Sequence, residues 1–195
     1  MTPPSPDIVL ASRSPRRHQL FEMLGISHVV DPVHIDERPV PGEAPEPFAQ
    51  RLAREKALAG AERHPGTWVL GADTVVVLDE EILGKPASPV EAEEMLLRLA
   101  GRRHRVVSAI ALSRGEDLHE AHDVTSVWMR SMTREMAREY VATGEPMDKA
   151  GSYAVQGMGA ILVDRIEGDY FGVMGLPVRL VVELMGLAGI PYNFS

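Results

Sequence analysis

The fold is decided by the stretch Trp68-Val69-Leu70-Gly71-Ala72-Asp73-Thr74-Val75-Val76-Val77-Leu78. These residues are β-rich and almost all apolar, which is the pattern of a central strand covered on both faces. Asp73 interrupts the middle of this strand. Because burying a carboxylate is costly unless a cation or hydrogen bonds receive it, Asp73 is a candidate for a metal-binding or catalytic role. The structural alternative is an aspartate that accepts hydrogen bonds from backbone amides.

Shorter elements lie on the N-terminal side of this strand. Residues 8–11 predict a short buried strand. Ser14 followed by Pro15 predicts the start of a helix, because serine is a good N-cap and proline fits the first helical position. Gly25 is the expected end of that helix. The next segments are a short strand and then a loop within residues 31–47, and a helix over residues 48–63.

The C-terminal side alternates strands and helices. The expected elements are a turn at residues 79–80, strands over 82–83, 106–112, 123–129 and 161–166, and helices over 89–99, 133–142 and 177–187. The glycine-rich residues 149–159 resist assignment and are expected to form a functional loop. Because at least two strand pairs are hairpins, the sheet is expected to be mixed. The predicted fold class is therefore α/β of a mixed, α+β-like kind, with a cleft.

The composition is that of an ordinary globular protein. Of the 195 residues, 45% are hydrophobic and 25% are charged, so the chain can bury a core and is not expected to be disordered. The 20 Lys and Arg against 28 Asp and Glu give a net charge of -8, which disfavours binding to a nucleic acid polymer. No cysteine is present, so any metal must be held by carboxylate, imidazole or water. Oxygen ligands favour magnesium or manganese.

The sequence has no pattern of an export or membrane segment. Residues 1–6 lack the basic and apolar regions of a secretory signal and are expected to form a short Pro-rich extension. No apolar run approaches the roughly 20 residues of a transmembrane helix. We therefore expect no membrane partner and a cytoplasmic location.

Basic side chains from three segments are candidates for binding one polyanionic ligand. Arg16 and Arg17 fall in the first turn of the helix after Pro15, where the helix dipole disfavours a cation unless an anion is bound. Lys56 lies beside the apolar stripe of the helix over residues 48–63, so it must extend to water or meet an anion. Lys85 follows a short strand. A lone Arg or Lys is usually a solvated charge, and only these settings favour a functional role.

The loop within residues 31–47 offers a second carboxylate. Glu37, beside Asp36, is a candidate for binding a metal or orienting water, although acids in loops are commonly solvated. A Walker A loop is excluded, since Asp79 and Pro86 stand where that motif requires glycine and Ser or Thr. The residues alone therefore predict metal-assisted phosphate chemistry.

The candidate residues fall within short motifs spaced along the chain. These motifs are Leu10-Ala11-Ser12-Arg13-Ser14-Pro15-Arg16-Arg17, Arg51-Leu52-Ala53-Arg54-Glu55-Lys56-Ala57, Gly71-Ala72-Asp73-Thr74, Gly84-Lys85-Pro86, Gly144-Glu145-Pro146-Met147-Asp148-Lys149-Ala150-Gly151-Ser152-Tyr153, Gln156-Gly157 and Gly175-Leu176-Pro177. Each motif is short, but the ordered set is highly specific. In order and spacing it resembles the Maf family of nucleotide pyrophosphatases, over nearly the whole chain after Pro6.

The resemblance implies a single domain over residues 7–195, with a fold similar to that of inosine triphosphate pyrophosphatases. In that fold an elongated mixed β-sheet is flanked by helices and forms two lobes with a central cleft. The resemblance also implies a homodimer. The implied reaction converts a nucleoside triphosphate and water into the monophosphate and pyrophosphate, in a house-cleaning role. It requires a divalent metal cation, which would be magnesium, manganese or cobalt.

The resemblance also assigns roles by position. Asp73 would be the catalytic proton acceptor and, together with Glu37, a metal ligand. The implied substrate-binding residues are Ser12, Arg16, Arg17, Lys56 and Lys85, and Lys85 would also act in catalysis. This chemistry is sound, because an aspartate beside a metal can accept a proton from water and cations neutralise the leaving pyrophosphate.

Members of the family divide by the residues at three positions, which are Arg16, Thr74 and Gln156 in this chain. One branch has tryptophan, glutamine and glutamate there, which suits a methylated guanine. The Gln156 amide both donates and accepts hydrogen bonds, which fits the mixed edge of uracil or thymine. The chain therefore resembles the branch that acts on dTTP and UTP, and modified pyrimidine nucleotides are further candidate substrates.

Two other functions stay open at this point. Maf-like proteins have been linked to restraint of septum formation, so the chain could act as a nucleotide-sensing regulator of cell division. A phosphatase that removes single phosphates is the third reading. The sequence does not rank dTTP, UTP and CTP as substrates.

Overall fold

The computed structural model describes residues 8–194, and the extension expected at residues 1–6 lies outside them. The strands form one sheet in the order β2-β1-β3-β5-β6-β7, with β4 paired to β3 outside this path. Their bounds are Ile8–Leu10 (β1), His28–Val30 (β2), Trp68–Leu78 (β3), Glu81–Leu83 (β4), Arg103–Arg114 (β5), Asp117–Met129 (β6) and Val163–Glu167 (β7). Strand β1 runs parallel to β2 and β3, whereas β4 is antiparallel to β3 and β7 to β6. The predicted mixed α/β class is confirmed.

The helices also follow the sequence pattern closely. Their bounds are Pro15–Met23 (α1), Pro45–Arg63 (α2), Pro89–Leu99 (α3), Arg134–Ala142 (α4), Tyr170–Met174 (α5) and Val178–Leu187 (α6), with short 3-10 segments at Glu145–Asp148 (η1), Ala150–Ser152 (η2) and Gly157–Leu162 (η3). Helix α1 begins at Pro15 after Ser14 and is followed by Gly25 with φ 67°, as predicted. Helix α5 was not predicted.

Several of the sequence predictions are wrong at the element boundaries. The short strand expected after Asp31 lies before it, at β2, and residues 31–44 form no helix or strand. Helix α2 begins at Pro45 instead of Phe48, because prolines in a first turn lack only N–H groups that have no helical partner. Strand β7 begins at Val163 instead of residue 161, because η3 continues to Leu162.

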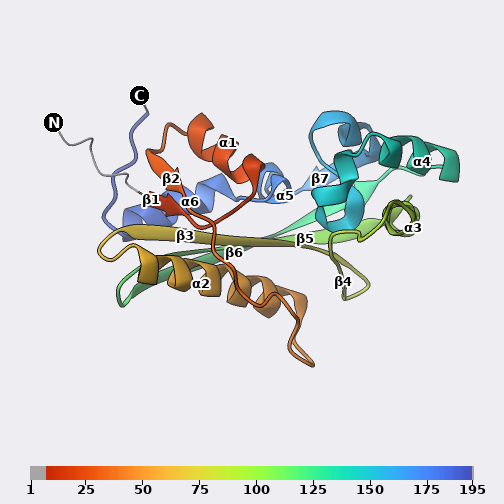
Figure 1. Ribbon diagram of the computed structural model, residues 1–195. Helices are drawn as coiled ribbons and strands as arrows, with labels where there is room; N and C mark the ends of the chain where they lie inside the picture. The colour runs from red at the N-terminus through yellow and green to blue at the C-terminus, as the bar shows by residue number, and fades with distance from the viewer. Residues whose placement is uncertain (1–7, 195) are drawn as a thin grey trace. The chain divides into compact units, whose positions relative to one another are not determined.

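The chain divides into two compact units. Unit 1 comprises residues 8–73, 108–122 and 175–194 of the described chain, and unit 2 comprises residues 74–107 and 123–174. In unit 1, α2 lies on one side of the sheet and α1 and α6 lie on the other (Figure 1). The side chains of β1 are buried throughout, which is what a strand covered on both faces requires.

Helix α2 packs directly on β3 at Gly71. A Cβ atom at this position would lie 2.2 Å from the Ala53 oxygen and 2.4 Å from the Ala57 nitrogen, both in the α2 backbone. Only glycine allows this approach. The missing side chain at Gly71 therefore sets how closely α2 approaches β3.

Unit 2 has its own apolar core beneath α3 and α4. Leu96 and Leu99 of α3 pack with Val127 of β6 and with Tyr140 of α4. Helix α3 is capped by Ser88, whose side chain accepts from the Glu91 N–H, and α4 is capped in the same way by Thr133. The helix expected over residues 133–142 is therefore α4, with Thr133 as its N-cap.

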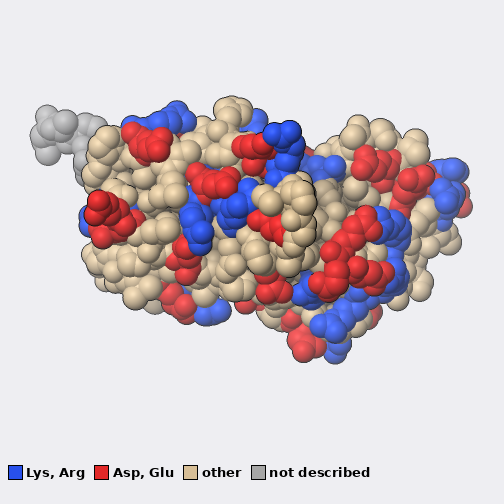
Figure 2. Space-filling view, turned by 90° about the horizontal axis from the view of Figure 1, so that it is seen from below, with Lys and Arg blue, Asp and Glu red and all other residues tan. Residues whose placement is uncertain are grey.

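Charged side chains of both signs are interspersed on the face drawn in Figure 2. Oppositely charged side chains also form ion pairs within each unit, for example Arg54 with Glu120 in unit 1 and Arg102 with Asp79 in unit 2. This face therefore presents no segregated basic surface of the kind that binds a long polyanion. Among residues 8–194, no helix is both long and apolar enough to span a bilayer.

Candidate active site

The side chain of Lys56 joins two carboxylates in unit 1. Its Nζ atom lies 2.7 Å from Asp73 Oδ1 and 2.8 Å from Glu37 Oε1. Lys56 and Asp73 are each only 9% exposed. The apolar strand thus buries the Asp73 carboxylate together with a cation, as the cost of burying a lone charge requires. The three sequence candidates form one cluster.

The local sequence explains why Lys56 and Asp73 meet. Side chains two residues apart on a strand point to the same face, so Asp73 faces α2 as Gly71 does. Lys56 follows Leu52 by one helical turn and therefore points from α2 toward the same strand. The absence of a side chain at Gly71 brings the helix close enough for the ion pair.

Arg17 is buried and contacts the peptide that precedes Asp73. Its Nε donates to the Gly175 oxygen at 2.8 Å, and its Nη1 donates to the Ala72 oxygen at 2.9 Å and to Ser12 Oγ at 3.1 Å. Burial lowers the pKa of Arg17, and the nearby Asp73 charge opposes this effect. Arg17 therefore connects α1 with the β3 backbone and with the segment before α6.

Ser12 and Arg16 lie next to this arginine. The buried Ser12 Oγ also accepts from the Ser14 N–H at 3.2 Å, so it fixes the turn that leads into α1. Arg16 is half-buried in the first turn of α1. The proposed site residues of unit 1 therefore lie in two groups. Lys56, Asp73 and Glu37 form one. Arg17 and Ser12 form the other, and Arg16 lies beside it.

The two neighbouring acids of the loop before α2 have different partners. Asp36 forms an ion pair with Arg38, whose hydrogen bonds lower the pKa of Asp36 to about 2. Glu37 instead turns to Lys56. Glu37 thus contacts the Lys56 cluster, and its role as a metal ligand stays a prediction.

Sequence reasoning missed the anchor of this loop. Arg51 of α2 donates to Glu43 Oε1 at 2.7 Å and to the Arg38 oxygen at 3.2 Å. These contacts attach the chain that follows Glu37 to α2. Arg51 belongs to the motif around Lys56, which is the one signal in the sequence that could have identified it.

The remaining candidates, Lys85, Thr74 and Gln156, belong to unit 2. Lys85 is exposed and, among residues 8–194, forms no ion pair. The Gly84 oxygen beside it accepts from the Gly151 N–H at 3.0 Å, which ties the Lys85 loop to the segment that leads to Gln156. Thr74 is half-buried in β3, and Gln156 is half-buried at the start of η3. Their convergence with the Lys56 cluster stays a prediction.

The Lys56 cluster offers two carboxylates to a divalent metal. Within residues 8–194, no group of three or more His, Asp or Glu side chains is arranged to hold a metal ion. Asp73 and Glu37 nevertheless contact the same ammonium, so their oxygens lie close enough to share one cation. Magnesium is commonly held by one or two carboxylates, with waters and substrate phosphates completing its shell. The donor set fits such an ion.

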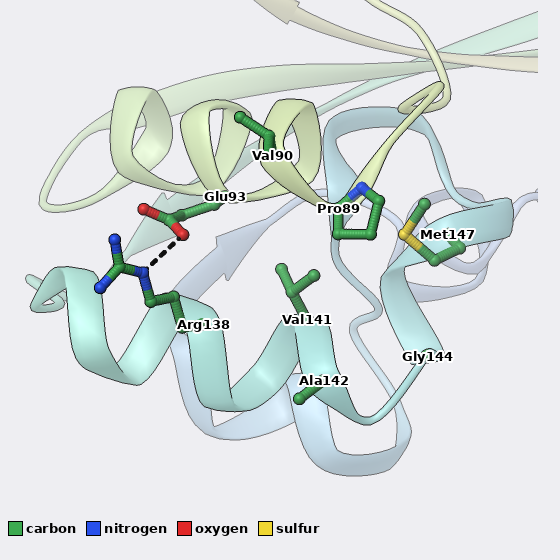
Figure 3. A pocket seen from close by; sticks show the side chains of 8 residues that line it. All are labelled: Pro89, Val90, Glu93, Arg138, Val141, Ala142, Gly144 and Met147. Carbon is green, nitrogen blue, oxygen red and sulfur yellow. Dashed lines mark hydrogen bonds and ion pairs between the residues drawn. The ribbon is translucent and has the colours of Figure 1, made fainter.

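A separate pocket of about 430 Å³ lies in unit 2 among α3, α4 and η1 (Figure 3). It is lined by Pro89, Val90, Glu93, Arg138, Val141, Ala142, Gly144 and Met147. The one charged pair that Figure 3 draws there joins Glu93 to Arg138. The pocket is mostly apolar and contains none of the predicted site residues.

The ordered motifs that carry these side chains identify the family of the chain. The chain belongs to the Maf family, described as Maf-like protein, whose pattern matches residues 7–187. It is 48% identical over 184 residues to the dTTP/UTP pyrophosphatase of Symbiobacterium thermophilum, with 94% of this chain and 95% of that protein covered. It is also 48% identical over 186 residues to the dTTP/UTP pyrophosphatase of Myxococcus xanthus, which covers 94% of this chain and 93% of that one.

Solved structures offer more distant likenesses. A HAM1 protein from Coxiella burnetii is 20% identical with a TM-score of 0.47, over 64% of this chain and 73% of that one. The Ham1 protein of Staphylococcus aureus is 16% identical with a TM-score of 0.44, over 92% of this chain and 88% of that one.

Proposed function

We propose that this chain is a nucleoside triphosphate pyrophosphatase that hydrolyses dTTP and UTP to the monophosphate and pyrophosphate. The observation that carries the proposal is the buried Asp73 carboxylate, which lies 2.7 Å from Lys56 and beside the Glu37 carboxylate. Membership of the Maf family and relatives named dTTP/UTP pyrophosphatase support the same activity.

In this proposal Asp73 accepts the proton of the attacking water at a carboxylate oxygen. The apolar strand around it keeps the carboxylate in place. A divalent cation, which would be magnesium, manganese or cobalt, would be held by Asp73 and Glu37 and would supply a Lewis acid that neutralises phosphate charge. The loop anchor at Arg51 keeps Glu37 within reach of this position.

The cations of unit 1 bind the phosphates. An ammonium has three N–H donors, and in the described part of the chain Lys56 has two carboxylate partners, so one donor is available for a phosphate oxygen. Arg17 and Arg16 add positive charge at the start of α1, where backbone N–H groups also favour an anion. Lys85 supplies a further cation from unit 2 and stabilises the leaving pyrophosphate.

The base is selected by Arg16, Thr74 and Gln156. The Gln156 amide presents one donor group and one acceptor, which matches the mixed edge of uracil and thymine and extends to modified pyrimidines. A house-cleaning role follows if the modified forms are the working substrates. Assembly as a homodimer and a cytoplasmic location belong to the same proposal, and light scattering of the purified protein tests the former.

The test is a pyrophosphate-release assay over a panel of nucleotides with magnesium, manganese or cobalt. Asp73→Asn is expected to lower kcat by about 100-fold or more, because it removes a general base. Asp36→Asn, which affects only the Arg38 pair, is the matched control and should keep activity. Orthophosphate as the first product would contradict the reaction, and faster turnover of a methylated guanosine triphosphate would contradict the base assignment.

A further inference from the structure

Glu145 forms the centre of a hydrogen-bond network in unit 2. This residue opens η1, and its carboxylate accepts three hydrogen bonds. Oε1 accepts from the Tyr140 hydroxyl at 2.7 Å and from the Gly159 N–H at 2.9 Å, and Oε2 accepts from the Met158 N–H at 3.0 Å. The carboxylate therefore holds the first turn of η3 by its backbone.

Tyr140 extends this network to the residue two positions before Gln156. Its hydroxyl oxygen accepts from the Ala154 N–H at 3.1 Å while its proton is donated to Glu145. Burial and then the hydrogen bond to Glu145 raise the pKa of Tyr140, so the hydroxyl stays protonated near neutral pH. The two backbone attachments, at Ala154 and at Met158, lie two residues on either side of Gln156.

The protonation state of Glu145 suits this role. Burial alone would raise the pKa of Glu145, but hydrogen bonds from Tyr140, Gly159 and Met158 outweigh it and keep the pKa below its ordinary value. Glu145 is therefore a carboxylate near neutral pH and accepts from all three donors at once. A neutral amide could not, because its NH₂ group would face an N–H or O–H donor.

The residue after Gln156 lies directly on the carboxylate. Gly157 has φ +72°, and a Cβ atom there would lie 2.6 Å from Glu145 Oε2. The segment is also held upstream, where the buried Tyr153 hydroxyl lies 2.7 Å from His104 Nε2. Within residues 153–159, the stretch between the attachments is therefore short, and Gln156 is its central residue.

We infer that Glu145 and Tyr140 are positioning residues that set the Gln156 amide for recognition of the nucleotide base. They touch the backbone on both sides of Gln156 and act only through it. This inference rests on the proposed function, which assigns base recognition to Gln156. It predicts that the pair governs nucleotide selectivity and KM, and that kcat depends on it much less.

The test compares pyrophosphate release from dTTP, UTP and GTP by the full-length protein, four single variants and one double variant. Glu145→Gln removes one acceptor, and Tyr140→Phe removes only the hydroxyl while keeping the ring in the core. Each is expected to raise KM for dTTP about tenfold and to lower the preference for dTTP over GTP similarly, with kcat changed less than about threefold. Glu139→Gln, an exposed neighbour on α4, is the matched control.

A double-variant comparison separates positioning from a general structural role. Gln156→Ala should lower the same preference, and adding Glu145→Gln should lower it no further, because both act through one group. Hydrogen exchange should be faster at the Met158 and Gly159 amides in Glu145→Gln than in the parent. If Glu145→Gln lowers thermal stability strongly, Tyr140→Phe decides the question.

The outcomes distinguish the inference from the proposed function. If the parent protein hydrolyses dTTP but Tyr140→Phe keeps the parent selectivity, the inference is overturned and the proposed function stands. Losses in Gln156→Ala and Glu145→Gln that add independently overturn it as well. If the parent releases no pyrophosphate from dTTP or UTP, the proposed function fails first and the inference falls with it.

Discussion

Lys56 on α2 lies 2.7 Å from Asp73 on β3, and both side chains are buried. Removing one member of a buried ion pair leaves the other charge without compensation. Lys56→Met should therefore lower the free energy of unfolding by about 3 kcal/mol and abolish turnover. Urea unfolding at pH 7 measures the first effect. The exposed ion pair of Arg54 and Glu120 gives the control, since Arg54→Met should cost less than about 1 kcal/mol.

Substitution of alanine for glycine should change stability in opposite directions at Gly71 and Gly186. Gly71→Ala forces a methyl group into backbone atoms of Ala53 and Ala57, so it should cost at least about 2 kcal/mol of stability. Gly186 lies in α6 with nothing near its missing Cβ, and Gly186→Ala should stabilise the protein by about 0.5 kcal/mol. Thermal unfolding of the two variants checks both signs. Similar shifts would contradict the packing argument.

Arg17 should not tolerate replacement by lysine. Its Nε and Nη1 atoms reach acceptors on three segments, and an ammonium cannot reproduce that fork. Arg17→Lys is expected to cost about 2 kcal/mol of stability and more than tenfold in kcat/KM for dTTP. Arg13→Lys, at an exposed position in the same motif, should stay within about 0.5 kcal/mol of the parent. Equal behaviour of the two variants would show that the fork is dispensable.

His104 predicts how stability changes with pH. Burial lowers the pKa of His104 from an ordinary value of 6.5 to about 4, so between these values the unfolded chain binds a proton that the folded chain does not. The free energy of unfolding therefore loses nothing to His104 above pH 6.5. As the pH falls from 6.5 toward 4, protonation of the unfolded chain lowers this free energy by roughly 1.4 kcal/mol per pH unit. His104→Gln keeps a polar group near Tyr153 but cannot titrate. Its unfolding free energy should fall less steeply over this range, and parallel curves for the two proteins would refute the assignment.

The sequence pattern predicted the elements wherever periodicity and end signals agreed. Strand β3 was predicted with its observed bounds, because a β-rich apolar run bounded by turn residues indicates a buried strand. Helix α3 was equally clear from Pro89 and its apolar stripe. The 3-10 segments between Glu145 and Leu162 were not predicted, since turns of this kind follow hydrogen bonds such as those of Glu145 instead of a repeating pattern.

The charged residues of the candidate site could be predicted from the sequence, but most of their partners could not. Asp73, Lys56 and Arg17 drew attention because each charge conflicts with its local surroundings. Their partners could not be read from the same pattern, because a hydrogen bond such as that of Arg17 to Gly175 joins residues 158 positions apart. The roles of Arg51 and Glu145 were missed because charged residues in a polar setting give no such conflict.

The separation of Arg17 from Gly175 along the chain affects the order in which the protein folds. Arg17 is synthesised 158 residues before its acceptor at Gly175, so the guanidinium cannot take its final place until that acceptor has left the ribosome. Contacts between residues far apart also form slowly, because a long loop must close first. After dilution from denaturant, recovery of pyrophosphate release should therefore lag behind recovery of the helical signal.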